Sequence, residues 1–170
     1  LMAMAMFGLR TLPGIDRPAI CSVLPTMNGE SCMLDLGANV ECSAENLVQF
    51  AVMGEVFART VLGLAKPTIG LMNIGVEELK GNEEVKAAAN TIRNSNLPIE
   101  FKGFVEGDDI SKGTVDVIVT DGFTGNVALK TVEGTSKLIS TFIRETFQSS
   151  LMAKIGYLFA SRSIAKLRLR

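Results

Sequence analysis

Three short polar segments of this chain combine glycines with side chains that can bind an anion, and each follows a predicted strand. They are residues 35–39 (DLGAN), residues 79–83 (LKGNE) and residues 121–126 (DGFTGN). In an open α/β sheet, ligands bind outside the carboxyl ends of the strands. We therefore expect the last two segments to converge at one edge of a parallel sheet and to share a phosphate site.

Residues 121–126 could hold a phosphate at the point where a helix begins. Gly122 and Gly125 allow close backbone approach, and Thr124 and Asn126 offer side-chain donors. The first-turn amides of a helix are unpaired, and the helix dipole favours negative charge. The alternative is an ordinary glycine turn in which Thr124 or Asn126 caps the helix.

Lys80 and Asn82 stand just before a helix that is predicted to begin near Glu83. A lysine in that place can neutralise a phosphate, and an asparagine amide can donate a hydrogen bond to it. The alternative is a lysine in solvent and a helix cap. Earlier in the chain, Asp35 and Asn39 could orient partners by hydrogen bonding, although both residue types are common in turns.

The residue types exclude several kinds of chemistry. The chain has no histidine, so a Ser-His-Asp or Cys-His mechanism is excluded within it. Its three cysteines lack the paired spacing of a zinc or redox site, and we expect reduced, structural thiols. No G-x-G-x-x-G follows a predicted strand, which argues against a dehydrogenase. We expect no cofactor and no metal.

The hydrophobic pattern predicts alternating strands and helices. Apolar runs on either side of Asn28 and Gly29 predict a hairpin, and Ser43 is a predicted N-cap. The alternation predicts an α/β fold with three α/β/α layers and a doubly wound, mostly parallel sheet. The expected helices cover residues 1–12, 43–63 and 83–94 and a long stretch from residue 126; the expected strands cover residues 19–24, 31–36, 68–74, 99–105 and 115–120.

The end of the chain predicts a basic, amphipathic helical extension. We divide the chain into an α/β core over residues 1–150 and this segment over residues 151–170, whose charges are all positive. The pattern suits contact with an anionic membrane surface, and it suits a helical pair across a dimer interface equally well. No apolar run is long enough to cross a membrane, so we expect a soluble or surface-attached protein. The predicted membrane-contact residues are Leu151, Ile155, Leu158 and Phe159.

Four motifs in register resemble the phosphate acyltransferase family. They are TLPGIDRPA (residues 11–19), LDLGANVEC (34–42), KGNE (80–83) and DGFTGNVALK (121–130). The resemblance implies a homodimer of the α/β/α type, similar in fold to phosphotransacetylases and isocitrate dehydrogenases. It also implies an enzyme that converts acyl-ACP and inorganic phosphate into acyl phosphate and free acyl carrier protein.

The resemblance implies roles for individual residues as well. Lys80 and Asn126 become the leading catalytic residues, followed by Asn82 and Asp121. The implied reaction needs no protein nucleophile, because phosphate can itself attack a thioester if an anion site lies beside donors for the developing oxyanion. The residues expected to bind substrate and phosphate are Asp35, Gly37, Asn39, Gly122, Thr124 and Gly125.

Members of the family are longer than this chain, which resembles their central part. The resemblance implies a cytoplasmic protein of bacterial phospholipid synthesis, peripherally associated with anionic lipid at the inner face of the cell membrane, with no nucleic acid partner. Two alternatives stay open. One is a phosphotransacetylase-like enzyme that acts on acyl-CoA, and the other is a non-catalytic module for membrane-surface contact or dimerisation.

Overall fold

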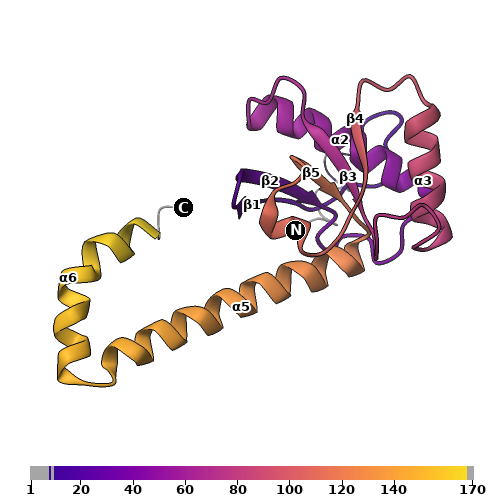
Figure 1. Cartoon of the computed structure of the whole chain (residues 1–170). Coiled ribbons are helices and arrows are strands. Elements are labelled where there is room, and N and C mark those ends of the chain that lie inside the picture. Colours follow the sequence, from indigo (N-terminus) through magenta and orange to yellow (C-terminus); the bar gives the residue numbers. More distant parts are fainter. Residues whose placement is uncertain (1–7, 9, 168–170) are drawn as a thin grey trace. The chain divides into compact units, whose positions relative to one another are not determined.

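The computed structural model describes residue 8 and residues 10–167 of the chain. The strands in this part form a mixed sheet in the order β1-β2-β5-β3-β4 (Figure 1). β1 and β2 are antiparallel, and the other neighbouring strands are parallel. The predicted α/β class with a mostly parallel sheet is therefore confirmed. The strands are β1 (Cys21–Thr26), β2 (Gly29–Leu34), β3 (Thr68–Met72), β4 (Glu100–Val105) and β5 (Val117–Val119).

Helices follow most of these strands along the chain. They are α2 (Ala44–Val61), α3 (Glu83–Asn94), α4 (Asp109–Lys112), α5 (Gly122–Gln148) and α6 (Leu151–Leu167). The predicted helix over residues 1–12 falls almost wholly outside the described residues, and residues 10–12 are not helical. The short helix α4 is absent from the prediction, because a single turn has no apolar period to detect.

The predicted hairpin is formed by β1 and β2, with Met27 and Asn28 in its turn. Thr26 pairs with Gly29 at the turn, and Gly29 has a φ of 117°. A backbone with this φ is strained for a residue with a side chain, which explains the glycine. β2 also pairs in parallel with β5. The hairpin therefore forms one edge of the main sheet.

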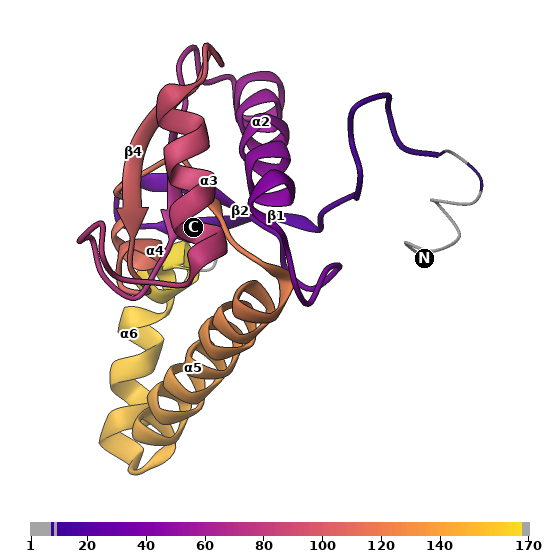
Figure 2. The same cartoon turned by 90° about the vertical axis from the view of Figure 1, so that its right-hand side faces the viewer.

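One face of the sheet is covered by α2 and α3, which lie side by side (Figure 2). Phe50 and Ala58 of α2 and Ala88 of α3 are fully buried in a cluster that includes Val117 of β5. Gly54 lets α2 approach β5, because a Cβ there would lie 2.5 Å from a methyl group of Val117. This close packing holds the amino ends of both helices in fixed places relative to the strand ends.

Contacts within the chain divide it into two units, and each is described by itself. Unit 1 comprises the residues up to Ala128, with the sheet, α2, α3, α4 and the first turns of α5. Unit 2 begins at Leu129 and contains the rest of α5 together with α6. Among the described helices, none is long and apolar enough to cross a membrane. α6 begins at Leu151, where the predicted basic segment begins, and the role of that segment stays a prediction.

Candidate active site

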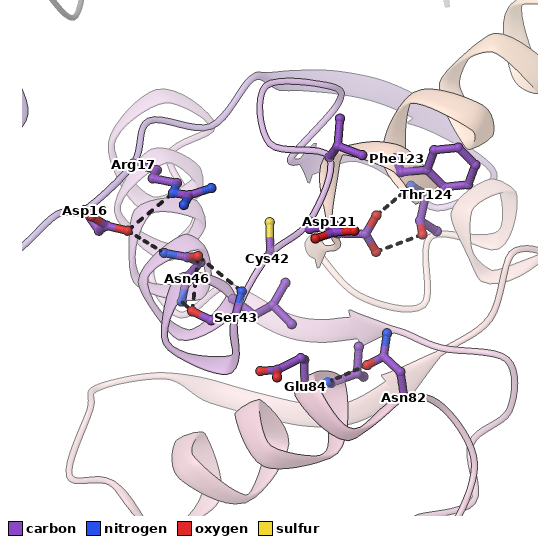
Figure 3. Close-up of a pocket in the computed structure, with 14 residues that line it drawn as sticks. Asp16, Arg17, Cys42, Ser43, Asn46, Asn82, Glu84, Asp121, Phe123 and Thr124 are labelled. Atoms are coloured by element: carbon purple, nitrogen blue, oxygen red, sulfur yellow. Dashed lines mark hydrogen bonds and ion pairs between the residues drawn. The ribbon is translucent and has the colours of Figure 1, made fainter.

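The amino ends of three helices meet at one pocket of unit 1 (Figure 3). The pocket has a volume of about 910 Å³, and the three helices are those that follow β2, β3 and β5. Its lining includes Ser43 before α2, Asn82 before α3 and Thr124 in the first turn of α5. The segments 79–83 and 121–126 therefore converge at one edge of the parallel sheet, as predicted.

Each of the three helices is capped by a side chain that lines the pocket. The hydroxyl of Ser43 accepts a hydrogen bond at 3.3 Å from the third backbone N–H of α2. The Oδ1 atom of Asn82 accepts one at 2.8 Å from the N–H of Val85, and Asp121 Oδ1 accepts one at 2.8 Å from the N–H of Thr124. Asn82 thus acts as a helix cap here. The first-turn N–H groups and the helix dipoles still favour an anion in the pocket.

The charged side chains of the pocket are mostly acidic. Arg17 is the one basic residue in its lining, and the lining includes four carboxylates. The Nε atom of Arg17 lies 3.4 Å from Asp16, and about half of the Arg17 side chain is exposed. An anion in this pocket would be stabilised by Arg17 and the helix amino ends against the repulsion of these acids. The acids are Asp16, Glu41, Glu84 and Asp121.

Asp35 is completely buried and holds together the loop that follows β2. Its Oδ1 atom accepts hydrogen bonds from the backbone N–H groups of Ile20, Gly37 and Ala38, at 2.9 to 3.2 Å. Its Oδ2 atom accepts two more from Asn39, at 2.7 Å from the backbone and 2.9 Å from the side chain. These five donors satisfy the hydrogen-bonding capacity of the carboxylate within the protein. Asp35 therefore fixes the conformation of the loop over residues 35–39, and its predicted role in binding stays a prediction.

The glycines of residues 121–126 allow this segment to pack closely against residues 35–39. The N–H of Gly122 donates to the carbonyl of Asn39 at 2.7 Å, and a Cβ on Gly122 would lie 2.5 Å from the same oxygen. A Cβ on Gly125 would overlap the carbonyl oxygen of Asp35. Gly37, with a φ of 130°, packs beside the side chain of Asn126. These glycines therefore let the start of α5 pack on the Asp35 loop, and the predicted contact of Gly122 and Gly125 with phosphate stays a prediction.

Lys80 lies outside the lining of the pocket. Its Nζ atom is 2.9 Å from a carboxylate oxygen of Glu77, and this hydrogen bond raises the pKa of Lys80 above its ordinary value. The loop that carries Lys80 is braced by Asn73, whose Nδ2 atom donates to the carbonyls of Gly75 and Lys80, both at 3.1 Å. Gly81 has a φ of 92°, and a Cβ there would overlap Asn73. Lys80 is therefore a protonated, exposed lysine held by Glu77.

The structure brings some of the predicted residues together and separates others. Asn82, Asp121 and Thr124 line the pocket, whereas Lys80 and Asn126 do not. Asn126 is exposed, and its side chain makes no hydrogen bond to the described part of the chain. The predicted binding residues Asp35, Gly37, Asn39, Gly122 and Gly125 are not part of the pocket lining.

Sequence reasoning missed Arg17, Asp16 and Cys42 as pocket residues. Arg17 and Asp16 stand inside the motif TLPGIDRPA, and that motif was the available signal for them. The Nδ2 atom of Asn46 donates to Asp16 at 3.1 Å, which ties this segment to the first turn of α2. Burial raises the pKa of the Cys42 thiol, so the pocket presents a neutral thiol.

In fold, the chain is similar to solved phosphotransacetylases. One is EutD phosphotransacetylase from Staphylococcus aureus, with a TM-score of 0.60 and 16% identity over 78% of this chain and 46% of that chain. Another comes from Streptococcus pyogenes, with a TM-score of 0.59 and 18% identity over 75% of this chain and 44% of that one. The sheet and its helices therefore have a phosphotransacetylase-like α/β fold.

A model of the fatty acid synthesis protein family matches residues 1–170, and the chain belongs to this family. A phosphate acyltransferase from Paramagnetospirillum magneticum is 67% identical over all 170 residues, which cover 48% of that protein. A phosphate acyltransferase from Rhodospirillum centenum is 66% identical, again over the whole chain and 48% of its own length. The chain thus spans about half the length of these relatives.

Proposed function

We propose that the chain forms the central part of a phosphate acyltransferase, which transfers a fatty acyl group from acyl-ACP to inorganic phosphate for phospholipid synthesis. Membership of the fatty acid synthesis protein family and similarity to proteins named phosphate acyltransferase support this proposal. The observation that carries it is the pocket at which Arg17 and the amino ends of α2, α3 and α5 meet. Phosphate is an anion, and a site made of an arginine and helix amino ends is suited to bind an anion.

The proposed step balances without a protein nucleophile. An oxygen atom of phosphate attacks the thioester carbonyl carbon, a C–O bond forms and the C–S bond breaks. The thiolate of the carrier leaves and takes up the proton that the phosphate loses. Arg17 would hold the attacking phosphate, and Thr124 and Asn82 would lie at its border. Lys80 and Asn126 keep their proposed catalytic roles, for which the long, exposed side chain of Lys80 must leave Glu77.

The phosphotransacetylase-like fold is also compatible with a second acyl donor. An enzyme of this fold could take the acyl group from acyl-CoA, with the same phosphate site and the same products apart from the thiol. A non-catalytic module is the third proposal. Offering acyl-ACP and acyl-CoA in parallel separates the first two, and failure with both favours the third.

We further propose a cytoplasmic homodimer with peripheral contact to anionic membrane lipid. The apolar side chains that unit 2 exposes support this part of the proposal, and they include Leu151, Leu158 and Phe159. Lys154 and the basic residues after it add positive charge to the same segment. In this proposal residues 1–150 are the catalytic core and residues 151–170 the surface-contact segment.

The test is formation of acyl phosphate by a full-length version mixed with acyl-ACP and phosphate, followed by mass spectrometry. Arg17→Gln should raise the KM for phosphate about ten-fold, because it removes a charge-assisted contact. Lys66→Gln is the matched control, since Lys66 is an exposed cation that does not line the pocket. Equal KM values for both variants would show that Arg17 does not contact the phosphate.

Lys80→Ala should abolish turnover with little loss of stability, and near-normal turnover would show that Lys80 is only a surface lysine.

A further inference from the structure

Arg17, the basic residue that lines the pocket of unit 1, lies in a segment without regular secondary structure. Residues 16–20 belong to no helix or strand. The hydrogen bonds of a helix or sheet therefore do not fix the direction of the Arg17 side chain, and about half of that side chain is exposed. Its position depends on the contacts that hold its neighbours in the chain.

Both chain neighbours of Arg17 are held by asparagine side chains. The Nδ2 atom of Asn46, in the first turn of α2, donates a hydrogen bond at 3.1 Å to Oδ2 of Asp16 (Figure 3). The Nδ2 atom of Asn39 donates one at 2.8 Å to the carbonyl of Pro18. Arg17 therefore stands between one residue that is tied to α2 and one that is tied to the loop after β2.

α2 makes a second hydrogen bond to Asp16. The backbone N–H of Asp16 donates to Oε1 of Gln49 at 2.8 Å. Asn46 and Gln49 are three residues apart and thus lie on the same face of α2. Because Asn46 holds the carboxylate and Gln49 holds the backbone, rotation of Asp16 would break at least one of the two hydrogen bonds.

The amide of Asn46 has a fixed orientation of its own. Asn46 is only 5% exposed, and its Oδ1 atom accepts hydrogen bonds from the backbone N–H of Ser43 at 3.2 Å and from the Ser43 hydroxyl at 3.1 Å. These two donors require the oxygen of the amide on their side, which directs Nδ2 toward Asp16. The reversed amide would place a donor against donors and leave the carboxylate without its partner.

The carboxylate of Asp16 connects this arrangement to Arg17. Its Oδ2 atom, which accepts from Asn46, is also the atom that lies 3.4 Å from Nε of Arg17. An exposed ion pair contributes little by itself, because solvent screens it and both side chains lose freedom. Here α2 already holds the carboxylate in place, so less freedom is lost when Arg17 pairs with it.

We propose that Asn46 is a positioning residue for the phosphate site: it holds Asp16, and Asp16 directs the guanidinium of Arg17 toward an anion in the pocket. Pairing of Nε with Asp16 leaves the two terminal nitrogens of the guanidinium for that anion. The inference rests on the proposed function, because it requires phosphate to bind at Arg17. One amide then serves both the cap of α2 and the phosphate site.

Asn46→Asp separates positioning from helix capping. An aspartate keeps the acceptor for Ser43, and its charge is favourable at a helix amino end, so α2 stays capped. It cannot donate to Asp16 and places a second carboxylate beside it. In the full-length protein the KM for phosphate should rise about ten-fold while kcat changes less than about two-fold, because a binding contact is weakened.

An exchange of the two partners tests the contact itself. Asp16→Asn combined with Asn46→Asp reverses donor and acceptor at unchanged net charge, and it should restore the KM to within about three-fold of the original value. Glu41→Gln combined with Asn46→Asp removes an equal charge from the pocket lining without restoring the contact, so the KM should stay raised. Asn90→Asp adds the same charge to an exposed position of α3 outside the lining and should leave the KM unchanged.

Gln49→Leu is the second variant, in case Asn46→Asp does not fold, which circular dichroism checks. It removes the acceptor for the N–H of Asp16 and leaves the capping box of α2 intact, so the KM should rise about three-fold. An unchanged KM in Gln49→Leu and in the folded Asn46→Asp would show that α2 does not position Arg17. Equal rescue by Asp16→Asn and by Glu41→Gln would show an effect of charge alone and would also overturn the inference.

The proposed function can fail separately. Calorimetric titration of the full-length protein with inorganic phosphate measures binding without turnover. If Arg17→Gln and Asn46→Asp both weaken phosphate binding while no acyl phosphate is formed, the positioning role stands and the acyltransferase proposal falls. If acyl phosphate is formed and Arg17→Gln raises the KM while Asn46→Asp does not, the reaction stands and Asn46 only caps α2.

Discussion

The helices of unit 1 and unit 2 carry similar apolar stripes but differ in what covers them. Phe50 of α2 and Ile92 of α3 are buried in the cluster beneath the sheet. Phe142 of α5 and Leu158 of α6 are exposed over 56% and 72% of their surface. An apolar stripe therefore predicts a helix in both units, but it does not predict whether a sheet, a partner or solvent covers that stripe.

This difference separates two uses of apolar surface. In unit 1, burial of the stripes of α2 and α3 supplies stability that holds the amino ends of these two helices at the pocket. In unit 2, the exposed stripes contribute little to folding and leave apolar surface that a lipid surface or a second copy could cover. We therefore expect substitutions in unit 1 to change stability first, and substitutions in unit 2 to change binding first.

The largest contrast should come from two glycines of the same helix, α5. A Cβ on Gly125, in unit 1, would overlap the carbonyl oxygen of Asp35, which is backbone and cannot move aside. Gly125→Ala should therefore lower the free energy of unfolding by roughly 3 kcal/mol. Gly134, in unit 2, has nothing within 4 Å of such a Cβ, so Gly134→Ala should raise it by about 0.5 to 1 kcal/mol.

Urea unfolding of the two glycine variants measures both effects. A small loss for Gly125→Ala would mean that the start of α5 does not rest on the Asp35 loop in solution. A loss for Gly134→Ala would mean that another surface packs closely against the middle of α5. Either result would weaken the distinction between a packed unit 1 and an open unit 2.

A smaller effect is expected at the cap of α3. Asn82→Ala removes the acceptor for the N–H of Val85 and should cost about 1 kcal/mol of stability. Asn82→Asp keeps an acceptor and should leave stability nearly unchanged, but it adds a negative charge to a pocket that already has four. The aspartate variant should therefore raise the KM for phosphate while its free energy of unfolding, measured with urea, stays nearly unchanged. The opposite pattern would make Asn82 purely a structural cap.

Features that depend on neighbours in the sequence could be predicted. Ser43 is the N-cap of α2 as expected, and α3 covers Glu83–Asn94 as predicted. Capping side chains and an apolar period act within a few residues, so the sequence contains their signal directly. The convergence of two loops at one sheet edge could also be predicted, because parallel strands send their carboxyl ends to the same side.

The contents of the site could be predicted only in part, because they depend on segments that are distant in the sequence. The carboxylate of Asp35 binds the N–H of Ile20, and a glycine of α5 rests on the Asp35 loop. The position of Arg17 in the pocket follows from such contacts and not from its neighbours. Lys80 can reach either Glu77 or open solvent, and spacing alone does not choose between them. The sequence therefore predicted which segments come together at the site, but it did not predict which of their side chains line the pocket.

The smallest effect on stability is expected for Leu158→Glu combined with Phe159→Glu in α6. Both side chains are mostly exposed, at 72% and 86%, so the free energy of unfolding should change by less than about 0.5 kcal/mol. If this face contacts membrane, the double variant should be released from vesicles of anionic lipid while acyl transfer in solution continues. Vesicle sedimentation and urea unfolding of one preparation measure the two quantities.

The single variants sharpen this test, because Leu158 lines the groove between α5 and α6 and Phe159 does not. Contact with a membrane surface should be weakened by either glutamate, since both side chains are exposed and both charges would repel anionic lipid. A dimer interface in the groove should be broken by Leu158→Glu alone, and light scattering would then show monomers with or without lipid. Unchanged vesicle binding in the double variant would refute membrane contact through this face, and a large loss of stability would show that unit 2 is packed as closely as unit 1.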